Sequence, residues 1–330
     1  MWEKFAVLEG GEKNFAKQVE TLDLLRSWID VHKGGSPTNV GVYWIHYKPY
    51  EISKAFKAET GRKVSNGMVK CLLLELGFKY RKLSKNQATG VCEDRNRQFQ
   101  VIFNLVLAMS LGSPMISIDC KKKEEIGNLY RDGKCYMNGD LKVYDHDYSH
   151  LSEGKVVPHG IYDLQRNEGY VTIGTSHETA EFITDNLLWW WESYGIDQYP
   201  DAKNILIFCD SGGGNSYRHH AFKKKLLELA EKIGKDLIIC HYPPSASKWN
   251  PIEHRLFAQI HLAMEGAVFT DYLIIKTLIE KTTTKTGLKV IARIVDKEYQ
   301  IGSKTPKSDV DFSRITFNLT VPKLSYKIAC

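Results

Sequence analysis

The segment CHYPPSASKWNPIEHRLF (residues 240–257) decides how the rest of the chain is interpreted. Its pattern predicts the end of a strand, a loop stiffened by two prolines, and a helix that begins near Pro251. Proline is tolerated in a first helical turn because its missing N–H would have no partner there, and Asn250 is a good N-cap residue. Glu253 then lies in the first turn beside a rigid loop. The alternative is that Glu253 has no chemical role, and that a negative charge in the first helical turn is favoured only by the helix dipole.

Two further acids follow apolar, strand-forming runs. Residues 115–118 (MISI) precede Asp119, and residues 204–209 (NILIFC) precede Asp210. An isolated Asp after a strand is most often a turn or cap residue. Three carboxylates from three separate elements form a more specific set, because Mg²⁺ prefers oxygen ligands of this kind. A pair of such ions can stabilise the attacking and leaving oxygens of a phosphoryl displacement.

Four segments of the chain resemble bacterial insertion-sequence transposases of the Asp-Asp-Glu (DDE) superfamily. They are ISIDCKKKE (116–124), GIYDL with NEG (160–164 and 167–169), CDSGG (209–213) and PP with SKWNPIEHRLF (243–244 and 247–257). The Asn-Pro-Ile-Glu segment is similar to the mariner-like branch. The resemblance covers about residues 40–290. It implies a ribonuclease-H-like core, with Asp119, Asp210 and Glu253 as catalytic residues and metal ligands. Cys120 stands where the family pattern has Thr.

The expected fold is α/β: a ribonuclease-H-like mixed five-stranded sheet flanked by helices, with an N-terminal helical helix-turn-helix domain. The pattern allows this fold, and the resemblance selects it among α/β alternatives. The elements expected in the core are strand 115–121, hairpin strands 159–165 and 169–175, helix 177–195, strand 204–210, helix 216–233, strand 236–241 and the Glu253 helix.

We expect four regions along the chain. Residues 1–91 form an N-terminal helical DNA-binding domain, and residues 92–114 form a connecting helix. Residues 115–287 form the catalytic domain. Residues 288–330 form a small C-terminal β appendage, whose role the sequence does not indicate.

Residues 49–76 have the pattern of a helix-turn-helix. Two short amphipathic helices flank a Gly-containing turn, which is a generic arrangement on its own. The surrounding cations favour DNA binding, with the second helix in the major groove. A solvated basic face on a small helical domain is the alternative. The residues expected to contact DNA here are Lys63, Asn66, Lys70, Arg81 and Lys82.

A second set of DNA contacts is expected beside the three acids. Cations gather at the start of the helix over 216–233, in the loop before Glu253 and after Asp119. Such groups can position a phosphate backbone, and for the helix start a merely solvated face is an equal alternative. The candidates are Lys121, Arg218, Lys248, His254 and Arg255.

The composition limits the class of protein. The 330 residues allow two or three domains, and the net charge of +6 suits a phosphate-backbone partner without establishing one. Seven cysteines show neither Cys-x-x-Cys pairs nor zinc-ligand spacing, which indicates reduced thiols and argues against a zinc enzyme. No signal peptide and no apolar run of about 18 residues is present. We expect a cytoplasmic, nucleoid-associated bacterial protein without membrane contact.

The resemblance implies a DNA transposase that acts as a two-metal-ion nuclease and strand transferase. It would bind the ends of its insertion element, hydrolyse the phosphodiester with two Mg²⁺ (or Mn²⁺) ions, and transfer the freed 3′-OH into target DNA. The expected partners are double-stranded DNA, both terminal repeats and target, and further copies of the chain in a homodimer or larger homo-oligomer.

Two alternatives remain open at this point. One is a nuclease of the same fold that cuts without joining, against which the separate helix-turn-helix argues. The other is a catalytically inactive DNA-binding regulator, against which the presence of all three acids argues.

Overall fold

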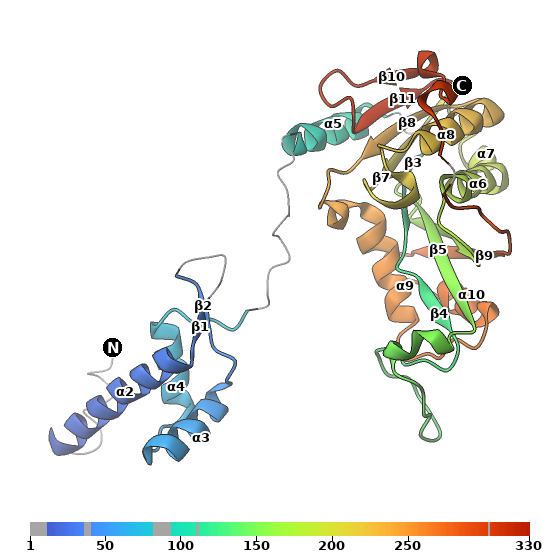
Figure 1. Ribbon diagram of the computed structural model, residues 1–330. Helices are drawn as coiled ribbons and strands as arrows, with labels where there is room; N and C mark the ends of the chain where they lie inside the picture. The colour runs from blue at the N-terminus through green and yellow to red at the C-terminus, as the bar shows by residue number, and fades with distance from the viewer. Residues whose placement is uncertain (1–11, 36–40, 82–93, 110–111, 303) are drawn as a thin grey trace. The chain divides into compact units, whose positions relative to one another are not determined.

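The computed structural model describes residues 12–35, 41–81, 94–109, 112–302 and 304–330 (Figure 1). The chain divides into two compact units, Met1–Gln87 and Ala88–Cys330. The boundary predicted between residues 91 and 92 lies outside the described ranges. Within those ranges, no helix has both the length and the apolar character that a membrane span requires.

The described residues of the N-terminal unit form three helices and a short pair of strands. Their bounds are α2 (Glu12–His32), β1 (Gly34–Gly35), β2 (Tyr43–Trp44), α3 (Pro49–Thr60) and α4 (Asn66–Glu75). The buried residues Leu25, Ile29, Phe56 and Leu72 belong to one apolar core shared by the helices.

Two local signals set the ends of the second and third helices. Gly61 ends α3 in the left-handed region at φ 73°, as a glycine after a helix commonly does. Ser65 caps α4 by accepting the N–H of Met68 at 3.1 Å. The two helices therefore lie where the sequence predicts them. That they act as a DNA-binding helix-turn-helix stays a prediction.

In the second unit, the residues that the structure describes form a mixed sheet of nine strands. Five of them correspond to the predicted strands: β3 (Met115–Cys120), β5 (Gly154–Asp163), β6 (Glu168–Gly174), β7 (Asn204–Cys209) and β8 (Asp236–His241). β3 pairs antiparallel with β5, and β5 with β6, whereas β3, β7 and β8 run parallel. The expected ribonuclease-H-like order, three antiparallel strands extended by two parallel ones, is confirmed.

The sheet is wider than the five predicted strands. β9 (Lys289–Val295) joins one edge beside β6, while β11 (Ser325–Ile328) and β10 (Ile315–Phe317) extend the other edge beyond β8. A short β4 (Glu124–Ile126) pairs with β5.

The C-terminal residues therefore correct the expectation of a separate β appendage over 288–330. β9 forms one edge of the main sheet, and β11 lies between β8 and the other edge strand, β10 (Figure 1). β9 and β11 have only seven and four residues, and their partners lie far away in the sequence. A local pattern predicts that such a strand exists, but it does not predict which strand it pairs with.

Helices cover both faces of the sheet (Figure 1). One face packs against α6 (Ala180–Trp190) and α8 (His220–Ile233) through a large apolar cluster. On the opposite face lie α5 (Arg95–Ala108), α9 (Ala258–Ala263) and α10 (Tyr272–Glu280).

The remaining helical segments are short. They are the turns η1 (His146–Leu151), η3 (Gly213–Asn215), η4 (Ser247–Trp249), η6 (Lys307–Asp309) and η7 (Phe312–Arg314), the π-helical turns η2 (Trp191–Gly195) and η5 (Glu253–Phe257), and α7 (Ile196–Gln198).

Candidate active site

Asp119 and Asp210 lie at the same edge of the sheet. Asp119 is near the end of β3, and Asp210 directly follows β7. The two strands are parallel, with Ser117 paired to Phe208. Continuing this register brings Asp119 level with Asp210. The two predicted strand-end acids therefore emerge from neighbouring strands at one place.

The third acid, Glu253, lies on a helix that packs closely on the sheet. Residues 251–263 are helical, and Glu253 opens the π-helical turn η5 inside this helix. Such turns are frequent at functional sites. Gly160, the partner of Asp119 in β5, allows the close approach. A Cβ at Gly160 would lie 2.6 Å from the Phe257 ring, so a larger residue would push the Glu253 helix away from Asp119.

Asp119, Asp210 and Glu253 influence one another's ionisation. The pKa of Asp119 is raised to about 8, first by burial and then by the negative charges of Asp210 and Glu253. Burial also raises the pKa of Asp210 and of Glu253, and Asp119 hydrogen-bonds with Glu253. Carboxylates that repel one another in this way favour a proton or a cation between them. The structure therefore brings together the three acids singled out in the sequence.

Asn250 connects the Glu253 helix to β3, and it does not act as the side-chain N-cap that the sequence suggests. Its side chain is completely buried. The amide NH₂ donates to Ile118 O at 3.2 Å and to Asp119 Oδ2 at 3.3 Å. Its Oδ1 accepts from the Ser117 hydroxyl at 2.5 Å, and that hydroxyl in turn accepts the Ile252 N–H at 3.2 Å. Asn250 thus orients Asp119.

The Asn250→Asp variant separates the two interpretations. As an N-cap, Asp would replace Asn with little cost. In the observed contacts, a carboxylate would replace the NH₂ donor beside Asp119. We therefore expect a loss of about 1–3 kcal/mol in the free energy of unfolding. Urea unfolding of the wild type and the variant measures this difference, and equal midpoints would contradict the positioning contact.

Asp210 also has a buried amide partner, Asn215, which no sequence pattern indicates. Asn215 is 3% exposed and hydrogen-bonds to the Asp210 side chain. Its Oδ1 has no hydrogen-bond partner among the described residues, so its NH₂ group is the donor to Asp210. A second donor is the Gly212 N–H, at 3.2 Å from Asp210 Oδ1. Each aspartate is therefore held by one buried asparagine.

A buried histidine supports the backbone behind Asp210. His241 Nδ1 lies 3.0 Å from the Asp210 carbonyl oxygen, and Nε2 lies 3.1 Å from the Tyr326 hydroxyl. Burial lowers the pKa of His241 to about 4, so the ring is neutral. The neutral ring then donates from Nδ1 to Asp210 and accepts from Tyr326 at Nε2. β11 thereby contributes to the site through Tyr326.

An open cavity of about 1160 Å³ lies beside Glu253. The segment after β3 and the Glu253 helix both line it. Its cationic side chains are Lys121, Lys122, Lys123, Arg131 and Lys155. The Lys121 ammonium is paired with Glu124, which also binds Arg131 at 2.8 Å. The structure therefore does not favour Lys121 as a DNA contact, because its ammonium is held in an ion pair within the protein.

The other cations predicted near the acids are exposed. Lys248 and His254 lie in the loop and first turn around Glu253, and Arg255 follows. The Lys248 ammonium lies 5.6 Å from the centroid of the exposed Trp249 ring. Arg218 precedes α8, and its Nε donates to the Tyr217 hydroxyl at 3.0 Å. These four side chains are accessible to a phosphate backbone.

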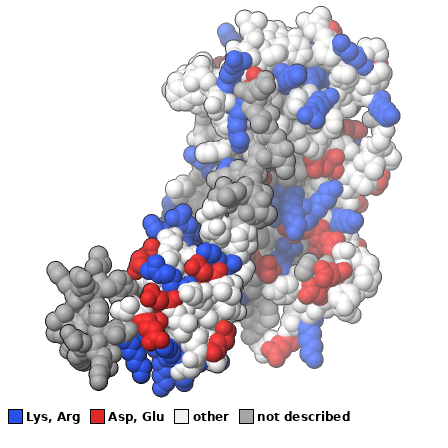
Figure 2. Space-filling view, turned by 60° about the vertical axis from the view of Figure 1, so that its left-hand side comes forward, with Lys and Arg blue, Asp and Glu red and all other residues white. Residues whose placement is uncertain are grey.

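The candidates of the N-terminal unit form a separate group. Lys63, Asn66, Lys70 and Arg81 are exposed, and Asn66 Oδ1 accepts from the Ser53 hydroxyl at 3.0 Å. Lys82 lies outside the described residues. Figure 2 shows acidic side chains among the basic ones on the visible face of this unit. Specific positions, and not a uniform positive surface, would therefore have to bind DNA.

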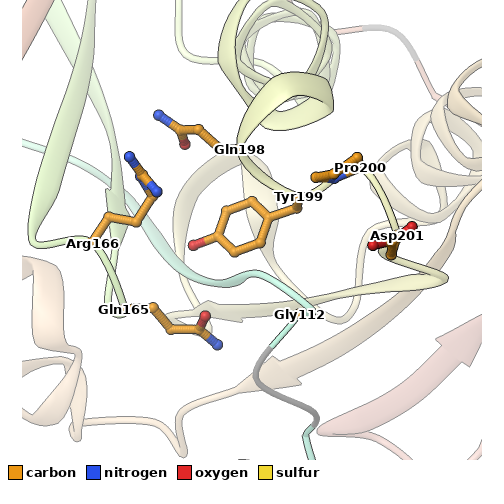
Figure 3. Close-up of a pocket in the computed structure, with 7 residues that line it drawn as sticks. All are labelled: Gly112, Gln165, Arg166, Gln198, Tyr199, Pro200 and Asp201. Atoms are coloured by element: carbon orange, nitrogen blue, oxygen red, sulfur yellow. The ribbon is translucent and has the colours of Figure 1, made fainter.

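A second cavity, of about 300 Å³, lies at the opposite end of the sheet (Figure 3). Tyr199, which follows α7, points toward the β5–β6 turn and donates to Asp163 Oδ2 at 2.7 Å. Arg166 in that turn pairs with Glu168 at 3.3 Å. The Tyr199 hydroxyl and the Arg166 guanidinium thus have partners within the protein, whereas the buried Gln198 Oε1 has none among the described residues. This cavity is formed by segments at the strand ends opposite to Asp119.

The three acids suit a divalent cation by their chemistry. They offer hard carboxylate oxygens, which Mg²⁺ and Mn²⁺ prefer, and their mutual repulsion is relieved by positive charge. Within the described part of the chain, no three His, Cys, Asp or Glu side chains already have the arrangement of a metal site. The argument for a divalent cation here therefore rests on the carboxylate oxygens of the three acids and on the repulsion between their negative charges.

A family model described as the Rhodopirellula transposase DDE domain matches residues 24–330. The match spans both units and includes all three acids. A comparison with curated proteins gives no match.

Solved structures similar to this chain are distant. A Mos1 transposase paired-end complex with left transposon end is 14% identical over 79% of this chain and 70% of that chain, with a TM-score of 0.46. A Mos1 mariner paired end complex with Mn is 15% identical over 84% of this chain and 82% of that chain, with a TM-score of 0.44. At this distance the likenesses do not bear on the reaction of this chain.

Proposed function

The chain belongs to the family of transposase DDE domains that matches residues 24–330, and we propose that Asp119, Asp210 and Glu253 are its catalytic, metal-binding residues. They would hold two Mg²⁺ or Mn²⁺ ions for cleavage of the element's ends and for strand transfer into target DNA. The interaction of the three acids supports this most strongly, since the charges of Asp210 and Glu253 raise the pKa of Asp119.

The residues of the chain have separate tasks in this proposal. Asn250 and Asn215 hold Asp119 and Asp210 in orientation by donating hydrogen bonds to them. The close packing of the Glu253 helix on Gly160 keeps Glu253 beside Asp119. When bound, the metal ions supply stabilisation of charge on the attacking and leaving oxygens. The protein itself forms no covalent bond to DNA.

The proposed DNA contacts fall into two groups. Lys248, His254, Arg255 and Arg218 would hold the backbone near the scissile phosphate. The unpaired cations of the open cavity, Lys122, Lys123 and Lys155, make no ion pair among the described residues and would extend this group. The α3–α4 pair would bind the element's end through Lys63, Asn66 and Lys70. Two copies of the chain would then hold two ends.

The raised pKa of Asp119 predicts that metal binding strengthens with pH. The folded pKa is about 8, against an ordinary 3.8, so a proton competes with the metal across this range. Each displaced proton strengthens binding by up to about 10-fold per pH unit. Titration with Mn²⁺ at pH 6.5 and 8.5 measures this change, and equal affinities would contradict it.

The raised pKa of Asp119 also makes the free energy of unfolding of the metal-free protein depend on pH. Between pH 3.8 and about 8 the folded apo-protein keeps a proton on Asp119 that the unfolded chain has lost. The free energy of unfolding contributed by this group therefore decreases as pH rises through that window. Added Mg²⁺ should raise the melting temperature more at pH 8.5 than at pH 6.5.

The N-terminal assignment predicts an effect of two lysines. The Lys63→Ala/Lys70→Ala double variant should bind element-end DNA more weakly, and its slope of log affinity against log salt should be smaller by about 2. Lys54→Ala, an exposed lysine on α3, is the control and should bind normally. Fluorescence anisotropy at several salt concentrations measures this, and an unchanged slope would argue against the assignment.

The proposed function is tested by incubating the protein with DNA that carries the sequences flanking its reading frame, target plasmid, and Mg²⁺ or Mn²⁺. Cleavage followed by joining supports a transposase that performs both steps. Cleavage without joining would favour a plain nuclease. Tight DNA binding without cleavage in either metal would favour an inactive regulator and would remove the triad assignment.

A further inference from the structure

Glu178 contacts both elements that hold the catalytic aspartates, although nothing in the sequence marks it. It lies in the connection between β6 and α6. Its Oε1 accepts the N–H of Gly214 at 3.1 Å, in the glycine-rich loop after Asp210. Its carboxylate also accepts a hydrogen bond from the thiol of Cys120, the residue that follows Asp119 in β3. One side chain thus links the end of β3 to the loop that follows β7.

The glycine-rich loop after Asp210 (residues 212–214) packs closely around the Glu178 carboxylate. Gly213 has φ +59°, a region that side chains other than glycine rarely adopt. A Cβ added at Gly213 would lie 2.2 Å from Glu178 Oε1, which is far inside contact distance. The loop therefore packs against Glu178 with no room for a side chain between them.

Cys120, which stands where the family pattern has Thr, contacts both Asp119 and Glu178. Its backbone N–H donates to Asp119 Oδ1 at 2.8 Å, while its thiol donates to Glu178. Thr could make the same side-chain donation through its hydroxyl. The residue next to Asp119 is thus fixed by the carboxylate that also fixes the loop of Asp210.

We propose that Glu178 is a positioning residue that holds the Asp210 loop against the end of β3 and so sets the separation of Asp119 and Asp210 for metal binding. This inference rests on the proposed function of the three acids. Glu178 acts through the Gly214 amide and the Cys120 thiol. Removing a side chain that helps to orient metal ligands typically weakens metal binding 10–100-fold.

The experiment compares Glu178→Ala with Glu178→Gln in the full chain. Alanine removes both contacts, whereas glutamine keeps an oxygen that accepts the Gly214 N–H but carries no charge. We expect Mn²⁺ affinity to fall at least about 10-fold in Glu178→Ala and to stay within about threefold of wild type in Glu178→Gln. Free Mn²⁺ is measured by electron paramagnetic resonance without DNA. Glu192→Gln, an exposed acid in the following helical turn, is the matched control.

Two further measurements separate positioning from misfolding. Amide exchange at Gly214 should accelerate in Glu178→Ala and not in the Glu192→Gln control, while melting curves report global folding. Cys120→Ser keeps a donor to Glu178 and should bind Mn²⁺ as wild type does, whereas Cys120→Ala should bind more weakly.

Each outcome bears on the inference. A loss in Glu178→Gln as large as in Glu178→Ala would overturn positioning, because it would make the charge itself the essential feature. Unchanged Mn²⁺ affinity in both variants, with wild-type binding intact, would overturn the inference and leave the triad standing. A wild-type protein that neither binds Mn²⁺ nor cleaves DNA would overturn the proposed function together with it.

Discussion

Replacing Asp210 with asparagine is expected to reduce metal-dependent DNA cleavage on the order of 10³-fold, a factor that corresponds to about 4 kcal/mol of transition-state stabilisation. Asn keeps the shape of Asp and can still accept the Gly212 N–H, which lies 3.2 Å from Asp210 Oδ1. It removes a negative charge that the metal ions require. Cleavage of a labelled element end over time measures the loss.

Stability separates this loss from misfolding. Burial raises the pKa of Asp210, with a further contribution from the charge of Glu178. The ionised form therefore costs stability in the metal-free protein at high pH. Asp210→Asn should then melt at the same or a higher temperature than wild type at pH 8.5 without metal.

The control for the loss of cleavage is Asp201→Asn, which changes an exposed acid at the second cavity and should cleave normally. Normal cleavage by Asp210→Asn would refute the assignment.

Deleting residues 315–330 is expected to unfold the catalytic unit. Val321 and Ile328 are completely buried, and Tyr326 is 2% exposed. Truncating one such aliphatic side chain typically costs about 2–5 kcal/mol, against a total stability of about 5–15 kcal/mol for a folded domain. The deletion also removes the hydroxyl that pairs with His241 behind Asp210. Circular dichroism and urea unfolding of the truncated chain measure the effect.

A point variant in the same segment provides the control for this deletion. Leu319 is fully exposed, at 101%, so Leu319→Ala should unfold at the wild-type urea concentration. Ile328→Ala should unfold at a clearly lower concentration. A truncated chain that unfolds at the same midpoint as the full chain would contradict the structure and would restore the view of residues 288–330 as an appendage.

The parts of the site that the sequence predicts have strong local signals. Asp119 and Asp210 end short apolar runs, and Glu253 follows a Pro-Pro loop and a helix-starting Asn-Pro pair. Strand type and helix start are local properties, so they are visible in a sequence window. Resemblance to the transposase family then supplied the order of strands, which the pattern alone left open among α/β folds.

The parts that the sequence missed depend on contacts between distant segments. Asn250 has the pattern of an N-cap, because the local sequence does not show that its NH₂ group reaches Asp119 across 131 residues. Glu178 precedes a helix, where an acid is common for local reasons. β11 has four residues and pairs with β8 some 85 residues away. Only the folded chain identifies these partners.

Anomalous X-ray diffraction from crystals of the protein soaked in Mn²⁺ would locate the metal ions themselves. We expect anomalous peaks within about 2.0–2.4 Å of carboxylate oxygens of Asp119, Asp210 and Glu253, and their absence in Asp210→Asn crystals grown in the same way. Peaks of equal height in the variant, or Mn²⁺ bound only at residues other than these three, would show that these acids are not the metal ligands.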